Sequence, residues 1–94
     1  MTQLDSEFVR SQFPAFSEPS LTGWGFFENA GGSYTCRQVI SCLNDYYTQT
    51  KVQPYYNFPA SQKAGAAMDE SYRLLAAYLN VNEDEVQFGP STTQ

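Results

Sequence analysis

The feature that most constrains the fold is the run of residues 86–93 near the C-terminus. Residues 86–88, Val-Gln-Phe, are β-prone, follow an acidic turn at 82–85 and are ended by Gly89-Pro90. Three hydroxyl residues, Ser91, Thr92 and Thr93, come next. In α/β proteins a strand that runs into small and hydroxyl residues forms an anion site, because backbone N–H groups and hydroxyls converge at the start of the next helix. We predict such a site here, with a frayed polar tail as the alternative.

Three helices are expected from hydrophobic spacing and from capping residues. The first covers residues 4–13, with Asp5 or Ser6 as its cap and Pro14 as its stop, after which residues 13–16 are expected to be extended. The second begins after a cap at Ser33 or Thr35 and runs to about residue 48. The third opens at Ser61, runs to residue 79 and ends at Asn80.

A second short strand is expected over residues 26–28, before the turn at 29–32, Asn-Ala-Gly-Gly. Asn and Gly tolerate positive φ and often begin loops, so an ordinary turn is one interpretation. The other is a loop whose backbone closely contacts a ligand. The aromatic loop over residues 50–59 has two similar interpretations. It is either a lid or subunit contact, or an active-site wall that excludes water.

The predicted fold class is an α/β fragment that is mostly helical and has two short strands. Such strands do not make a self-contained sheet, because their edges would stay unpaired. The chain is therefore expected to be the front piece of a larger enzyme. A cut just before the helix that should complete the anion site points the same way.

Composition excludes several functional classes. Ten acidic and five basic residues give a net charge of −5, which argues against nucleic acid or an anionic membrane as a partner. No apolar run approaches the roughly 20 residues that span a bilayer, and no signal-peptide core is present, so a cytoplasmic protein is expected. The chain lacks histidine, which removes His-dependent triads and imidazole metal sites from this segment.

Cys36 and Cys42 are expected to be buried or half-buried free thiols. They are six positions apart, which on a helix directs them about 120° apart, too divergent for a disulfide within the helix or a paired metal site. We expect no metal site in this segment.

The order of these motifs resembles the N-terminal portion of class V aminotransferases, and most closely the cysteine desulfurase and selenocysteine lyase-like branch. The resemblance begins near residue 13 and rests on residues 27–32, the amphipathic helix, the aromatic loop, the Ala-rich helix ending at 72–79, and residues 86–93. These are fold-type I enzymes that use pyridoxal 5′-phosphate (PLP). The resemblance implies an N-terminal arm at 1–25 and the start of a cofactor-binding domain at 26–94.

The resemblance also implies roles for particular residues. Thr92 and Thr93 would bind the cofactor phosphate, since hydroxyls and backbone N–H groups suit a dianion. Asn29, Ala30 and Gly31 would lie beside the carboxylate of an amino-acid substrate. The aromatic loop would lie near the active-site mouth and a partner subunit, so that a homo-oligomer, such as a dimer, is expected.

No catalytic residue is expected in the 94 residues themselves. Lys51 and Lys63 do not match the motif of the family's Schiff-base lysine, which lies downstream, as does the desulfurase nucleophilic cysteine. In addition, Asn57-Phe58-Pro59 replaces a basic, histidine-containing loop of better-known desulfurases. The chain alone is therefore predicted to be inactive. The alternative function is a small acidic, helical protein-interaction domain without catalysis; a different phosphate-ligand binder is a further possibility, weakened by the lack of Lys or Arg near Thr92.

Overall fold

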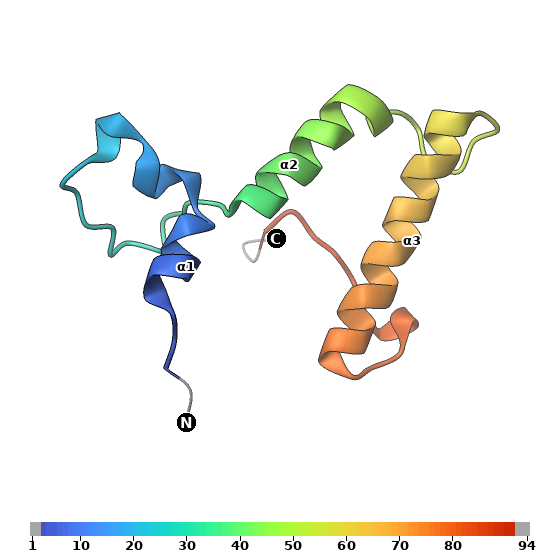
Figure 1. Cartoon of the computed structure of the whole chain (residues 1–94). Coiled ribbons are helices and arrows are strands. Elements are labelled where there is room, and N and C mark those ends of the chain that lie inside the picture. Colours follow the sequence, from blue (N-terminus) through green and yellow to red (C-terminus); the bar gives the residue numbers. More distant parts are fainter. Residues whose placement is uncertain (1–2, 92–94) are drawn as a thin grey trace. The chain divides into compact units, whose positions relative to one another are not determined.

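The structure, a computed structural model, describes residues 3–91 and is built from helices and turns (Figure 1). Its α-helices are α1 (Ser6–Ser11), α2 (Arg37–Asp45) and α3 (Pro59–Leu79). Short 3₁₀ turns cover Pro14–Ser17, Pro19–Leu21 and Glu83–Glu85, and a π-helical turn covers Tyr46–Thr50. The chain forms two compact units, which divide between Tyr47 and Thr48.

In the first unit, α1 is capped at both ends. The Asp5 side chain accepts a hydrogen bond from the Phe8 N–H at 3.1 Å, which confirms one of the two predicted N-caps. At the other end, the Arg37 N–H donates to the Gln12 carbonyl at 2.7 Å, and the Arg37 guanidinium donates to the Ser11 carbonyl. The start of α2 thus satisfies carbonyls that the end of α1 leaves without a helical partner.

Residues 13–16, expected to be extended, instead enter the 3₁₀ turn at Pro14–Ser17. Pro14 occupies the first turn, where its fixed φ suits a helical start. The turn brings the Phe13 and Phe16 rings to 6.2 Å between centroids, and the Arg10 guanidinium lies 3.8 Å from the Phe16 ring centre. An aromatic pair and a cation–π contact therefore accompany the turn.

Helix α2 begins later and ends earlier than expected. Its N-cap is Cys36, which makes no side-chain capping bond, so the predicted caps Ser33 and Thr35 are wrong. After Asp45 the helical path widens into the π-helical turn Tyr46–Thr50. The hydrophobic spacing that predicted this helix forms an apolar stripe of Val39, Ile40 and Leu43 on α2. These side chains remain 46%, 46% and 50% exposed.

In the second unit, α3 is closed at each end by backbone geometry. Asn80 adopts the left-handed conformation, φ 57°, and the Val81 N–H donates to the Ala76 carbonyl at 3.0 Å. This Schellman arrangement confirms that Asn80 ends the helix. The N-terminal end begins at Pro59, two residues before the predicted start at Ser61.

Ser61 is fully buried and ties the preceding loop to α3. Its hydroxyl accepts from the Tyr56 N–H at 2.7 Å and donates to the Gln53 carbonyl. Its carbonyl accepts from the Tyr55 N–H at 3.3 Å. Tyr55 takes a positive φ of 63° and lies against Gly65, where an added Cβ would be 2.7 Å from the Tyr55 ring. The close approach of the Tyr55 ring to α3 therefore requires a residue without a side chain at position 65.

The predicted α/β class is wrong for the residues that the structure describes, because residues 3–91 contain no strand. Residues 26–28 and 86–88, the two expected strands, have no regular secondary structure. A β-prone run becomes a strand only when a neighbour completes its hydrogen-bond ladder, and β-propensity mainly measures fit to a sheet surface. Here Phe26 instead meets the Tyr34 ring, and Phe88 meets the Tyr72 ring of α3.

Few of the described side chains are buried. The buried positions are Ser61, Ala64, Gly65 and Ala76, all on α3, whereas many large apolar side chains are exposed. Among residues 3–91, no helix combines the length and the apolar character needed to cross a bilayer.

Candidate substrate and phosphate site

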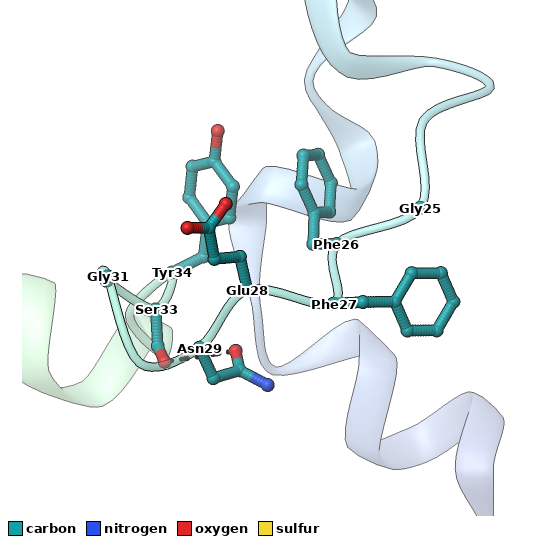
Figure 2. A pocket seen from close by; sticks show the side chains of 9 residues that line it. Gly25, Phe26, Phe27, Glu28, Asn29, Gly31, Ser33 and Tyr34 are labelled. Carbon is teal, nitrogen blue, oxygen red and sulfur yellow. Dashed lines mark hydrogen bonds between the residues drawn. The ribbon is translucent and has the colours of Figure 1, made fainter.

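The turn at residues 29–32 borders an open hollow of about 650 Å³ in the first unit (Figure 2). Backbone and side chains from one continuous segment form it. The lining residues are Gly25, Phe26, Phe27, Glu28, Asn29, Gly31, Gly32, Ser33 and Tyr34. The site is therefore assembled locally, after the 3₁₀ turn at Pro19–Leu21 and before α2.

Two hydrogen bonds shape the turn. The Gly31 N–H donates to the Glu28 carbonyl at 3.2 Å, and the Ser33 hydroxyl donates to Asn29 Oδ1 at 3.1 Å. Because Oδ1 accepts the Ser33 proton, the Asn29 amide nitrogen keeps its donors for another group. In Figure 2 this nitrogen points away from the bond to Ser33.

The glycines of the turn at 29–32 matter because they lack a side chain, and not because they adopt positive φ. Gly23 is the glycine with positive φ in the described chain, so the turn at 29–32 does not use the conformational freedom on which its prediction rested. A Cβ added to Gly31 would lie 3.7 Å from Glu28 Oε1, an ordinary contact. A Cβ added to Gly32 would meet nothing within 4 Å, which leaves its backbone open to a ligand.

Of the predicted substrate-side residues, Asn29 and Gly31 line the hollow, while Ala30 is not among the lining residues; their role beside a substrate stays a prediction. Glu28, Ser33 and Tyr34 line it without having been predicted as site residues. They could have been found from the sequence because they lie next to the Asn-Ala-Gly-Gly turn. When one continuous segment forms a hollow, the neighbours of the turn line it.

An aromatic pair and one carboxylate dominate the chemistry of the hollow. The Phe26 and Tyr34 rings meet edge to face, with centroids 5.0 Å apart and an angle of 68°. Glu28 is the charged side chain in the lining, and no lysine or arginine lines it. The Phe27 ring is 95% exposed and points away from the turn (Figure 2).

The predicted phosphate ligands, Thr92 and Thr93, lie outside the described residues. The segment that leads to them is anchored in the second unit, where the Phe88 and Tyr72 rings meet with centroids 4.9 Å apart. A hollow of about 260 Å³ lies between Phe88 and the α3 residues Met68, Ser71 and Tyr72. The ring contact thus holds Phe88, which precedes residues 89–91, against α3.

The cysteine, acidic and lysine side chains outside the hollow form no cluster among residues 3–91 that would serve as a metal or catalytic site. Cys36 and Cys42 are free thiols, as expected; Cys36 is half-buried, but Cys42 is exposed, so its expected burial is wrong. Among residues 3–91, no three acidic or cysteine side chains gather as a metal-binding group. The Lys63 ammonium donates to Gln49 Oε1 at 2.8 Å, and Lys51 is exposed in the loop that follows the π-helical turn.

The chain is related to an aminotransferase-like protein. It is 36% identical over 92 residues to the aminotransferase-like protein FGM3 of Gibberella zeae, a match that covers 94% of this chain and 22% of that protein. It is also 31% identical over 85 residues to the nonribosomal peptide synthetase-like enzyme fsqF of Aspergillus fumigatus, covering 90% of this chain and 6% of that enzyme.

The chain therefore spans about a fifth of the first relative and a much smaller share of the second. No family model matches the chain, and no solved structure matches it. The finding is a similarity between this chain and part of an aminotransferase-like protein.

Proposed function

We propose that the chain is the N-terminal segment of a PLP-dependent enzyme of the class V aminotransferase and cysteine desulfurase-like group, acting on an amino acid. The observation that carries this proposal is the 36% identity to an aminotransferase-like protein over 94% of the chain. A match over 94% of the chain is long enough to span the turn at 29–32. The parent is proposed to be a cytoplasmic homo-oligomer.

The hydroxyl-rich end of the chain fits the phosphate of PLP chemically. Ser91, Thr92 and Thr93 supply hydroxyl and N–H donors, which are the groups that bind a phosphate dianion. The next basic residue upstream is Arg73, on α3, so these donors are mainly neutral. Thr92 and Thr93 would hold the phosphate, and PLP, when bound, supplies the electron sink for breaking a bond at the α-carbon of an amino acid.

The turn at 29–32 would orient the substrate. A carboxylate needs hydrogen-bond donors, and the Asn29 amide and the open backbone at Gly32 supply donors beside the hollow. Phe26 and Tyr34 would cover part of the substrate and reduce its contact with water. Such positioning favours reaction by fixing geometry before the chemical step.

The proposal is tested on the protein isolated from its source. Its intact mass should exceed the 10.6 kDa of this chain, and it should carry the absorbance of bound PLP. Replacing Thr92 and Thr93 together by Val should weaken PLP binding, because two donors to the phosphate are lost. A source protein of 10.6 kDa without PLP absorbance would refute the proposal.

The 94 residues alone are proposed to be inactive. Mixed with PLP and reduced with borohydride, the chain should show no specific pyridoxyl adduct at Lys51 or Lys63. Lys63 already donates to Gln49, and both lysine side chains are exposed to water, so neither is enclosed in a pocket that would hold the cofactor against it. A stoichiometric adduct at either position would contradict this part of the proposal.

A second candidate function is an acidic protein-interaction domain, favoured by the exposed apolar stripe of α2 at Val39, Ile40 and Leu43. Such a domain would fold cooperatively as a stable monomer. The segment of a larger enzyme would instead self-associate or pack loosely when isolated, because its apolar faces lack their partners. Analytical ultracentrifugation combined with thermal unfolding separates the two candidates.

A further inference from the structure

The hollow at residues 25–34 has the composition of a site for a cation. We infer that it selects a substrate with a positively charged side chain, an inference that rests on the proposed function and specifies its substrate class. The inference depends on the Glu28 carboxylate, the Phe26–Tyr34 ring pair and the size of the hollow.

The Glu28 carboxylate is available to a ligand. No lysine or arginine nitrogen lies within 4.0 Å of it, since the ion pair in the described chain joins Arg73 to Glu70. The Glu28 side chain is also exposed, so a ligand can reach it from solvent. A cation in the hollow would therefore meet an unpaired negative charge, whereas an acidic side chain would be repelled.

The aromatic pair gives the cation a second contact. In an edge-to-face pair, the ring that presents its edge keeps its own faces free, and the Phe26 and Tyr34 side chains are 37% and 49% exposed. Ring faces carry negative electrostatic potential and attract ammonium and guanidinium groups. A carboxylate combined with aromatic faces recognises a cation better than either group alone, because the ring contact persists as water is displaced.

The size of the hollow and the charge of the chain agree with this substrate class. A hollow of about 650 Å³ is large enough for a long amino-acid side chain, and ligand pockets commonly measure about 300–1,000 Å³. The net charge of −5 also raises the local concentration of cations near the protein. At the turn, the Asn29 amide and the Gly32 backbone remain for the substrate's carboxylate.

The test compares L-lysine with L-norleucine, which has a side chain of similar length that lacks the terminal ammonium group. Both are titrated into the isotope-labelled full-length protein isolated from its source, and the backbone amide signals of Gly31 and Gly32 are followed by NMR. Lysine should bind about fivefold more tightly, as expected for one solvent-exposed charge pair. Glu28→Gln should reduce the preference for lysine, and the contact with the aromatic rings should account for what remains of it.

Glu7→Gln is the matched control, because it removes the same charge from exposed α1 in the same unit, outside the hollow. It should keep the preference for lysine. Equal binding of lysine and norleucine, or an equal loss in Glu7→Gln and Glu28→Gln, would overturn the inference and leave the proposed function standing. If neither amino acid shifts Gly31 or Gly32, the inference and the assigned substrate side both fail; PLP bound by the parent is measured separately.

Discussion

Replacing Ser61 by Ala tests whether one buried hydroxyl organises the loop before α3. Ser61 is 0% exposed, and its hydroxyl joins the Tyr56 N–H, at 2.7 Å, to the Gln53 carbonyl. The Ser61 carbonyl still accepts from the Tyr55 N–H in the variant, so the change removes the side-chain bonds alone. The loop should then open more often, while α3 stays formed.

The magnitude follows from two groups that lose their partner. An unsatisfied buried donor or acceptor costs about 1–3 kcal/mol, and the lower value applies here because the loop is only partly buried and water can reach it. Two groups give about 2 kcal/mol, from which the better helix propensity of Ala subtracts about 0.5 kcal/mol. The net cost is about 1.5 kcal/mol, or roughly a tenfold increase in the population of the open loop.

Amide hydrogen exchange measures this opening at the Tyr56 N–H. The matched control is Ser71→Ala, which makes the same substitution in α3 at an exposed hydroxyl that donates to the Ala67 carbonyl at 2.9 Å. The control should leave Tyr56 exchange unchanged. Equal exchange at Tyr56 in the two variants would refute the argument that Ser61 holds the loop.

Three further substitutions test contacts in the second unit. Gly65→Ala should displace the Tyr55 ring and destabilise the unit by about 1 kcal/mol, because overpacking costs more than the helix propensity gained; denaturant unfolding measures it. Asp69→Asn should lower the Tyr55 pKa, which the hydrogen bond to Asp69 raises above its usual value, and tyrosinate absorbance follows the titration. Phe88→Ala should cost about 1 kcal/mol and shift the NMR signals of the Tyr72 ring, because half-buried aromatic surface is lost.

The controls for these variants use neighbouring positions. Ala66→Gly isolates helix propensity, Tyr55→Phe identifies the Tyr55 titration among seven tyrosines, and Phe27→Ala removes a ring that is 95% exposed. An unshifted Tyr55 ring in Gly65→Ala, an unchanged titration in Asp69→Asn, or equal stability losses in Phe27→Ala and Phe88→Ala would contradict the corresponding prediction.

The pH dependence of stability follows from the sign of the Tyr55 shift. The raised folded-state pKa means that Tyr55 contributes stability below the pKa of an unfolded tyrosine, and that this contribution is lost as the pH rises through the folded value. Stability should therefore fall in alkaline solution, and less so in Asp69→Asn. Glu70 has the opposite sign, because the Arg73 guanidinium lowers its pKa, so its contribution is lost in acid.

Helix positions could be predicted from the sequence because their signals are local. Asp5 and Asn80 act as the expected cap and stop, since each satisfies backbone groups within a few residues. Ser61 shows the limit of this reasoning. It was predicted to open α3, yet its hydroxyl bonds to residues 53 and 56 of the preceding loop. The geometry of that loop determines these partners, and the local sequence does not specify them.

The strands could not be predicted in the same way, because a strand requires a neighbour. Residues 26–28 and 86–88 have suitable side chains, but the described chain offers no ladder to complete them. Asn29 and Gly31 line the hollow and Ala30 is not among its lining residues, but their role beside a substrate carboxylate stays a prediction. Thr92 and Thr93 lie outside the described residues, so their role stays a prediction.

The contrast between Ser61 and the stripe on α2 bears on the choice between the two proposed functions. The Ser61 hydroxyl completes its hydrogen bonds within one unit, so the loop it holds needs no other partner. Val39, Ile40 and Leu43 follow helical spacing yet remain about half exposed. Helical spacing of apolar residues is advantageous only when a second surface covers the stripe, which an enzyme's remaining domain or a binding partner would equally provide. The two functions differ in how long the stripe must be covered, because a segment of an enzyme needs its remaining domain at all times whereas a binding partner can dissociate. An isolated chain that stays monomeric and cooperatively folded would therefore favour the interaction domain.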